Sequence, residues 1–465
     1  MVMARMAVTK HEQGSHLNLG PVSSGLAALG HNPAHSRTGQ VMIQRRAFLA
    51  AGAGALGLAT AKAVAAPVLS ANNFGLTHAK AVRRNGWIEI DTAAFEANID
   101  AVHAIIGMTR LCAVMKADAY GNGIALLIPS ILAKQVGDVA ITSNDEARVA
   151  RQLGYRGRLY RIRTATPDEM EDGFRFGIIE LIGNPEAAAR LQTLYQKRKT
   201  GRALPVHLAL NSGGMSRNGV ELSTDYGKAD ARAMLALPGL KITGAMTHYP
   251  SEKAADILGQ LQRYQDDLSW LQGQGLETKG LVRHTANTFA TLIHPQTRLD
   301  MVRTGGALYG DPGSVQTSAF IQTMAIKSRI AAVNHYPAGQ TVAYDRTFRL
   351  ARESWLANIP IGYSDGIRRG FSHANRPEFP AEGHNHSQVL IDGQRYPIVG
   401  RVTMNTMMVD VTGAQDTVRL GDEVVLFGAQ GTERITQAEF EANSAAYAPE
   451  MLAMLGATLP KVRKV

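Results

Sequence analysis

Short apolar runs alternate with amphipathic segments along the chain from Trp87 to about residue 325. The runs have the length of buried strands, and the segments between them show helical spacing of their apolar residues. Strand followed by helix, repeated about eight times, is typical of a parallel sheet with crossover helices. Over roughly 240 residues, a closed TIM-type (β/α)8 barrel is the economical arrangement, and an open doubly wound sheet is the alternative. The strand candidates are residues 111–117, 138–142, 158–163, 178–183, 206–211, 241–249 and 298–305.

The hydrophobic pattern changes after Lys327, where short segments of alternating apolar and polar residues are separated by Gly, Pro and Asp turns. This pattern predicts an antiparallel β domain. We therefore expect an α/β barrel over residues 86–325 and a C-terminal β domain over residues 326–465. Residues 376–387 are expected to form a loop.

Residues 1–85 are expected to be an N-terminal extension that carries an export signal. Gln44-Arg45-Arg46-Ala47-Phe48-Leu49 precedes a run rich in Ala, Gly and Leu, and Ala63-Val64-Ala65 has the form of a cleavage site. This order is that of a twin-arginine signal cleaved near residue 65. A membrane anchor is the alternative, but the apolar run is only about as long as the shortest spanning helix. The sequence therefore predicts a periplasmic protein without stable membrane insertion.

Composition narrows the possible partners and ligands. The formal net charge is +10, but Lys and Arg are spread along the chain without interleaved aromatic residues, so nucleic acid is not an expected partner. Cys112 is the only cysteine, which excludes an internal disulfide and a thiolate zinc site. His384 and His386 form a candidate metal pair, but a solvated loop tip explains them as well, and no metal is predicted.

Lys116 is the first candidate for chemistry. It lies in the stretch AVMKADAYGNG (residues 113–123), at the carboxyl end of an early predicted strand, where TIM barrels carry their active sites. A lysine buried there is costly unless it is paired or bonded to a carbonyl cofactor. The alternative is a surface lysine that extends from a strand end into solvent.

Several further motifs follow in a fixed order. The motifs are GWIEIDTAAFEANI (86–99), AVMKADAYGNG, ALNSGGMSRNGV (209–220), AMTHY (245–249), HTANTFATL (284–292), RLDMVRTGGALYG (298–310), AGQTVAYDRTF (338–348), IPIGYSDG (359–366) and VGRVTMNTMMVDV (399–411). With these motifs the chain resembles the alanine racemase family, and more closely its periplasmic broad-specificity branch. The resemblance covers residues 87 to about 428.

The resemblance implies an amino-acid racemase that depends on pyridoxal 5'-phosphate (PLP). Lys116 would hold PLP as a Schiff base and act as one catalytic base, and Tyr344 would be the second base, contributed by the partner subunit of a homodimer with shared active sites. Racemisation removes the α-proton from one face and returns a proton to the other, so two bases on opposite faces suffice. Without the resemblance, Tyr344 reads equally well as an amphipathic residue of a hydrophobic hairpin.

The same resemblance assigns the residues around the cofactor and substrate. Phosphate would lie among Tyr120, Thr288 and the backbone of Gly305 and Gly306. Arg303 would face the pyridine nitrogen and keep it unprotonated, with pairing to Asp300 as an additional or alternative role. The other implied contacts are His248, Arg217, Asn287 and Tyr363 for the cofactor, and Arg217, Met404 and Asn405 for the substrate, the last two from the partner subunit.

Departures from the family pattern suggest a permissive site. Typical alanine racemases have a carbamylated lysine that holds the arginine equivalent to Arg217, and this chain has Ala209 at that position. Asn211, Asn218 or a bound chloride is expected to hold Arg217 instead. Asn405 replaces an aspartate, and the usual C-terminal tyrosine motif that narrows the entrance is absent. An open site suits larger and cationic side chains, so alanine, lysine and arginine are all candidate substrates.

Three other functions remain open at this point. One is a strict alanine racemase, and another is a PLP-dependent decarboxylase or lyase on the same barrel, which would not need Tyr344 as a base. The third is a non-enzymatic cofactor-binding protein made of a barrel alone. The predicted C-terminal β domain and export signal argue against the last.

Overall fold

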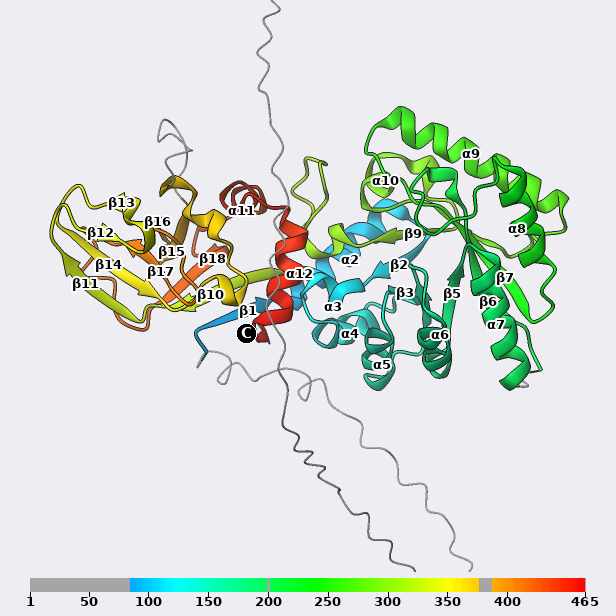
Figure 1. Cartoon of the computed structure of the whole chain (residues 1–465), viewed down its shortest axis with the longest axis horizontal. Coiled ribbons are helices and arrows are strands. Elements are labelled where there is room, and N and C mark those ends of the chain that lie inside the picture. Colours follow the sequence, from blue (N-terminus) through cyan, green and yellow to red (C-terminus); the bar gives the residue numbers. More distant parts are fainter. Residues whose placement is uncertain (1–83, 199–200, 376–386, 465) are drawn as a thin grey trace, which may run out of the picture. The chain divides into compact units, whose positions relative to one another are not determined.

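A computed structural model describes residues 84–198, 201–375 and 387–464. The predicted export signal and the pair His384 and His386 lie outside the described residues. Between Arg110 and Thr304, eight parallel strands form one sheet in the order β8-β7-β6-β5-β4-β3-β2-β9 (Figure 1). Pairing of β9 with β2 brings the last strand beside the first, so the sheet curls into a nearly closed barrel. The predicted (β/α)8 architecture is confirmed.

The barrel strands are short and almost completely buried, which explains why they read as continuous apolar runs. The sequence had indicated all of them except β8, whose three residues are too few to form a recognisable run. Their bounds are β2 (Arg110–Val114), β3 (Asp138–Ile141), β4 (Arg158–Arg161), β5 (Ile178–Ile182), β6 (Leu204–Ala209), β7 (Leu240–Met246), β8 (Val282–His284) and β9 (Met301–Thr304).

Helices follow most of the barrel strands and lie around the outside of the barrel (Figure 1). In α9, buried residues recur every three or four positions from Ile257 to Leu271, which is the spacing of a half-buried helix. Helix α5 begins with a capping box between Ser143 and Glu146. The helices are α2 (Thr92–Ile106), α4 (Ile124–Ala133), α5 (Asn144–Gln152), α6 (Pro167–Gly173), α7 (Pro185–Arg198), α8 (Asp225–Leu235), α9 (Ala254–Gly273) and α10 (Thr288–Ile293).

The C-terminal domain is built on a ten-stranded sheet, mostly antiparallel as predicted, with a separate two-stranded hairpin of β12 and β13. Helices α11 (Gln437–Ser444) and α12 (Ala448–Thr458) complete it. Its strands are β10 (Met324–Arg329), β11 (Ala332–Tyr336), β12 (Thr341–Val342), β13 (Phe348–Arg349), β14 (Ser354–Ile359), β15 (Gln388–Ile391), β16 (Gln394–Val399), β17 (Met407–Asp410), β18 (Glu423–Gln430), β19 (Glu433–Ile435) and β20 (Lys461–Arg463).

Strand β1 (Gly86–Ile90) differs from the expected domain division. It pairs antiparallel with β10 and parallel with β20, so it belongs to the C-terminal sheet and not to the barrel that was expected to begin at residue 86. A run such as GWIEI shows that a strand is buried but does not show which sheet buries it. From residue 86 onward the chain thus passes first through the second sheet and enters the barrel at β2.

Helix α12 packs on the segment that follows Lys116. A Cβ atom on Gly121 would overlap Leu452 O, and one on Gly456 would overlap the Gly121 backbone, so two glycines permit this approach. Asn122 is buried and accepts a 2.7 Å hydrogen bond from Thr323 Oγ1 while donating to Ala119 O. Among the described helices, none is long and apolar enough to cross a membrane.

Candidate active site

Lys116 follows the carboxyl end of β2 by two residues and opens the short segment α3 (Lys116–Tyr120). The next four residues have left-handed backbone angles, with φ of 54° at Ala117 and 55° at Tyr120, before Gly121 at 81°. Such angles cost about 1–2 kcal/mol for each non-glycine residue. Asp118 helps to hold this turn, because it accepts a 2.8 Å hydrogen bond from Ile124 N and pairs with Lys461 Nζ at 2.9 Å. The strained segment lies where the sequence placed the chemistry.

A cavity of about 350 Å³ opens beside Lys116, above the ends of the barrel strands. This volume suits a small cofactor with a small substrate. The cavity brings together nine residues that the sequence had selected: Lys116, Tyr120, Arg217, His248, Asn287, Thr288, Arg303, Gly305 and Gly306.

The surroundings of the Lys116 amine disfavour its protonated, charged form. Burial lowers its pKa, and the charges of Arg217 and Arg303 lower it further. The Nζ atom lies 5.6 Å from the centre of the Tyr120 ring, and Lys116 makes no hydrogen bond or ion pair with any described residue. A lysine that is desolvated and beside other cations is more easily deprotonated, which is what a nucleophile or proton acceptor requires.

One end of the cavity has the features of an anion site. Thr288 Oγ1 accepts long contacts from the backbone N–H groups of Gly305 (3.3 Å) and Ala307 (3.4 Å). A Cβ atom on Gly305 would overlap Tyr120 Oη, so only glycine leaves the backbone accessible there. The Tyr120 hydroxyl has no hydrogen-bond partner among the described residues, and burial raises its pKa. Asn287 accepts from Ala290 N at 3.0 Å and so caps α10 at the same end.

Arg303 is a buried residue of the cavity wall and is fixed by carbonyl and imidazole acceptors. It donates to His284 O at 2.7 Å, to His284 Nδ1 at 3.0 Å and to Thr247 O at 2.9 Å. Because arginine can only donate, His284 Nδ1 accepts, and its Nε2–H then donates to His207 Nδ1 at 2.8 Å. Burial lowers the pKa of Arg303 to about 10, so it stays protonated at neutral pH. The suggested pair with Asp300 is wrong, since Asp300 binds Arg283 at 2.8 Å.

His248 lines the cavity near Arg303, whose Nη2 lies 3.3 Å from its Nδ1. Burial, with the positive charges of Arg303, Arg217 and Lys116, lowers the pKa of His248 to about 3. Its imidazole is therefore neutral at physiological pH and can pack against an aromatic cofactor ring without adding a further charge.

Arg217 reaches the cavity without a protein partner. It makes no hydrogen bond or ion pair with any described residue, and Ala209 is buried in a small apolar cluster. Asn211 binds Ser216 N at 2.7 Å and Glu221 at 2.7 Å, while Asn218 accepts from Thr164 Oγ1 at 3.0 Å. These two asparagines shape the loop around Arg217 and do not bind its guanidinium.

Four predicted site residues lie apart from this cavity. Tyr344 is 66% exposed, Tyr363 41% and Met404 53%, and with Asn405 they project from the C-terminal domain. None lines the cavity near Lys116. Tyr363, Met404 and Asn405 lie on two segments that are bonded to each other. Tyr363 N donates to Thr403 O at 3.0 Å, and Asn405 Nδ2 donates to Ser364 Oγ at 3.0 Å.

Comparison with known proteins decides the family. Residues 90–312 match the model "Alanine racemase, N-terminal domain", and residues 323–463 match "Alanine racemase, C-terminal domain". The chain belongs to the alanine racemase family. It is 46% identical over 409 residues to a broad specificity amino-acid racemase of Aeromonas hydrophila, an alignment that covers 87% of this chain and 96% of the relative.

Two further relatives show how far the likeness extends. A lysine racemase of Proteus mirabilis is 43% identical over 384 residues, with 82% of this chain and 90% of the relative covered. The structure of alanine racemase from Streptomyces coelicolor A3(2) superposes with a TM-score of 0.72 at 27% identity, covering 83% of this chain and 99% of that one. The present racemase thus has the fold and both domains of its family.

The family's cofactor is PLP, and the cavity of this racemase fits it. Lys116 offers a desolvated amine that makes no hydrogen bond or ion pair with a described residue. PLP also needs an anion site for its phosphate, and Tyr120 with the accessible backbone at Gly305 provides one. Arg303 adds a positive charge that is held in the cavity wall by its bonds to His284 and Thr247. The predicted cofactor is confirmed.

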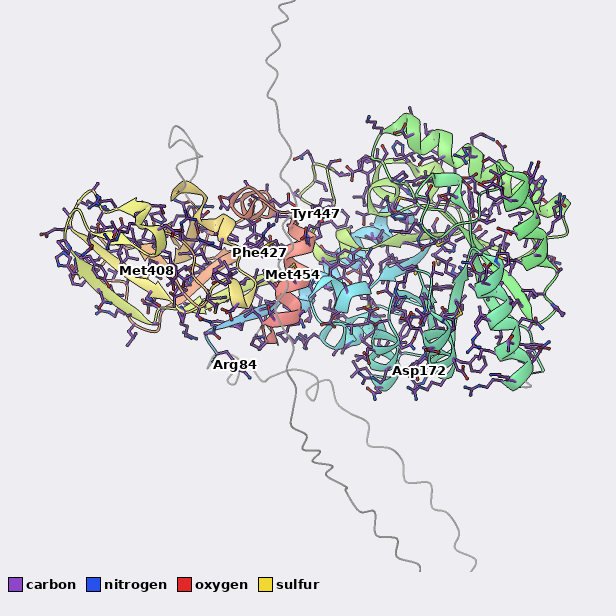
Figure 2. The ribbon with its side chains drawn as sticks, viewed as in Figure 1. Arg84, Asp172, Met408, Phe427, Tyr447 and Met454 are labelled. Carbon is purple, nitrogen blue, oxygen red and sulfur yellow. The ribbon has the colours of Figure 1, made fainter. Side chains whose placement is uncertain are left out.

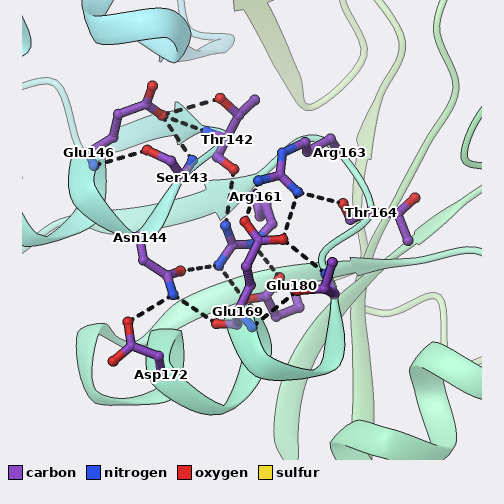
Figure 3. A network of polar contacts seen from close by, with 11 residues as sticks. Thr142, Ser143, Asn144, Glu146, Arg161, Arg163, Thr164, Glu169, Asp172 and Glu180 are labelled. Atoms are coloured by element: carbon purple, nitrogen blue, oxygen red, sulfur yellow. Dashed lines mark hydrogen bonds and ion pairs between the residues drawn. The ribbon is translucent and has the colours of Figure 1, made fainter. Parts of the chain in front are cut away.

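Sequence reasoning missed several residues of the racemase cavity. Thr142 and Arg163 follow the ends of β3 and β4, so the strand-end rule could have found them. They belong to a polar network in which Arg161 binds Glu180 at 2.7 Å and Arg163 binds Glu169 (Figure 3). The remaining additional lining residues are Val114, Ile162, Met246, Glu252, Phe289, Asp311, Gly313, Tyr447 and Pro449.

Tyr447 bears directly on the missing C-terminal tyrosine motif. It is the N-cap residue of α12 (Figure 2), and together with Pro449 it lines the cavity. The C-terminal segment therefore still brings a tyrosine to the cavity wall, although not at the position of the family motif. Only the packing of α12 on the barrel reveals this, because the sequence carries no signal for it.

Proposed function

We propose that this racemase has broad specificity and works with two bases, Lys116 of one subunit and Tyr344 of the partner subunit. The observation that carries the proposal is the separation of the predicted site into two parts, a cavity in the barrel and an exposed group on the C-terminal domain. Lys116 lines the cavity, whereas Tyr344 and Met404 lie exposed on the C-terminal domain of the same chain and do not line it. A second copy that places its C-terminal domain over the cavity would complete the site, as a twofold homodimer can do.

Bound PLP would supply an electron sink that lowers the cost of removing the α-proton of an amino acid. Lys116, Tyr120, Thr288, Gly305 and Gly306 would hold it. Lys116 Nζ accepts or returns the proton on one face of the α-carbon, and Tyr344 Oη of the partner subunit does so on the other. Arg303 stays protonated in the cavity wall, and Arg217, which has no hydrogen bond or ion pair with a described residue, offers its guanidinium to a carboxylate.

Tyr447 is the competing candidate for the second base, because it lines the cavity from the same chain. Burial raises its pKa, and the negative charges of Asp311, Glu441 and Glu252 raise it further. Its phenolate is therefore disfavoured. It also interacts electrostatically with Tyr120, a residue of the proposed phosphate site.

Hydrogen exchange separates the two tyrosines. In D₂O, Tyr344→Phe should still exchange the α-hydrogen of one enantiomer through Lys116 while racemisation falls by about 100-fold or more, the size expected for loss of a general base. Tyr447→Phe is the matched control, and it should retain racemisation within a few fold. The reverse result would assign the second base to Tyr447 and remove the need for a partner.

Broad specificity is supported by the relatives. The Aeromonas relative is a broad specificity racemase and the Proteus relative a lysine racemase. Purified protein should form D-enantiomers from L-alanine, L-lysine and L-arginine. Activity on alanine alone would identify a strict alanine racemase, release of carbon dioxide a decarboxylase, and no turnover a cofactor-binding protein.

We also propose export to the periplasm. The support is the order of Arg45, Arg46, the apolar run and the Ala63-Val64-Ala65 site. Replacing both arginines by lysine should leave the protein in the cytoplasmic fraction of a Gram-negative host. Unchanged periplasmic recovery would exclude the twin-arginine route.

A further inference from the structure

The turn that carries Tyr344 has an unusual backbone. Ala343 has φ 60° and ψ −159°, a combination that is almost confined to glycine, and Asp345 and Arg346 have φ of 64° and 52°. Three strained residues thus surround Tyr344 within a single short turn. Such a conformation persists only where its surroundings fix it.

An ion pair lies beside this turn. Asp345 Oδ2 is 2.9 Å from Arg401 Nε, and Arg369 Nη2 approaches the same oxygen at 4.0 Å. The Arg401 side chain is only 19% exposed. Its Nε–H has no hydrogen-bond partner among the described residues, so the contact with Asp345 is an ion pair.

Arg401 belongs to the segment that also carries Met404 and Asn405. A Cβ atom on Gly400, whose φ is 72°, would overlap Val342 O, so this segment lies directly against the start of the Tyr344 turn. A Cβ atom on Gly362 would likewise overlap Thr403 O and Met404 O. Close backbone contact and the ion pair therefore join the Tyr344 turn to the segments of Tyr363 and Met404.

We infer that Asp345, through its ion pair with Arg401, is a positioning residue for catalysis. It fixes Tyr344 relative to Met404 and Asn405, so that the proton-transferring hydroxyl and the substrate-carboxylate contacts enter the partner's cavity in one geometry. The inference rests on the proposed function, since it requires Tyr344 to act as a base. Displacement of a reacting group by about 1 Å can slow catalysis by about 100-fold, so a contact of this kind affects kcat more than binding.

The test uses Asp345→Asn, which keeps the size and the tolerance for positive φ but removes the charge. In the dimeric, PLP-loaded enzyme, kcat for alanine should fall about tenfold or more, while KM changes by less than about threefold. In D₂O the variant should retain α-hydrogen exchange from one enantiomer, on the Lys116 face, and lose it from the other. Glu353→Gln removes a carboxylate near His335 in the same domain and should leave both rates unchanged.

A double-mutant cycle decides whether the ion pair is responsible. Arg401→Gln should reproduce the loss in kcat, Arg401→Lys should restore part of it, and Asp345→Asn combined with Arg401→Gln should be no slower than either single change. Sedimentation must show dimers, and cofactor absorbance must show full occupancy, because dissociation would also remove Tyr344 from the site.

Three results would overturn the inference: an unchanged kcat in dimeric Asp345→Asn, strictly additive losses in the cycle, or equal loss of exchange from both enantiomers. These differ from failure of the proposed function. If Tyr344→Phe racemises at the wild-type rate, the two-base proposal itself fails. If Tyr344→Phe is slow and Asp345→Asn is normal, only the positioning role is excluded.

Discussion

Replacing His207 with glutamine should make the stability of the racemase less sensitive to acid. His207 is 3% exposed, and its Nδ1 lies 2.8 Å from His284 Nε2. Burial, with the charges of Arg110 and Arg303, lowers its pKa from 6.5 to about 3. A histidine whose folded pKa lies below its unfolded pKa takes up a proton on unfolding, so its contribution to stability is present above pH 6.5 and is lost as the pH falls.

The size of the effect follows from the two pKa values. At pH 5 the folded histidine, with a pKa of about 3, stays neutral, while the unfolded chain, with a pKa of 6.5, is almost fully protonated. Since pH 5 lies about 1.5 pH units below the unfolded pKa, protonation favours unfolding by about 2 kcal/mol. The glutamine variant keeps a hydrogen-bonding side chain but lacks this proton uptake.

The assay is urea unfolding of wild type and His207→Gln between pH 7.5 and pH 5, followed by circular dichroism. The variant should lose about 2 kcal/mol less stability than wild type over this range. His335→Gln, at an exposed histidine of β11, serves as the control and should keep the wild-type dependence. Parallel pH curves for wild type and His207→Gln would refute the assignment of a buried neutral histidine.

Three further changes test the packing around the site. Arg161→Met leaves Glu180 buried without the arginine that pairs with it at 2.7 Å, and should lower the free energy of unfolding in urea by about 3–5 kcal/mol. The added change Glu180→Leu should recover much of this loss. Gly305→Ala places a Cβ against Tyr120 Oη and should weaken PLP binding about tenfold or more in a fluorescence titration, whereas Gly259→Ala, at a glycine of α9 with open space around it, should not. Asn122→Ala removes the 2.7 Å hydrogen bond from Thr323 and should lower the free energy of unfolding by about 1–3 kcal/mol. An unchanged free energy of unfolding would contradict this role of Asn122.

The barrel could be predicted because its strands leave a strong local signal. Each of β2 to β7 is an apolar run followed by an amphipathic helix, and Lys116 stands where such a run ends. Strand β8 has only three residues, and β1 has the same apolar character as its barrel counterparts although it lies in the other sheet. Pairing partners are set by tertiary packing, so no local pattern could assign them.

The candidate site likewise contains residues that the sequence could identify and residues that only the folded structure reveals. Motif resemblance selected Tyr120, His248 and Arg303, and the folded barrel brings them around one cavity. Resemblance could not reveal Tyr447, because its place on the cavity wall depends on how α12 packs against the turn after Lys116. Nor could it show the ion pair between Asp345 and Arg401, which joins residues 56 positions apart through a strained turn.

The shared active site is tested most directly by a purified hybrid dimer. Lys116→Ala and Tyr344→Ala subunits with different affinity tags can be co-expressed and the mixed dimer isolated by both tags. Each parent dimer should be inactive, whereas the hybrid contains one site with both native bases and should recover about half of wild-type activity. A pure hybrid that binds PLP but shows no racemisation would contradict the account.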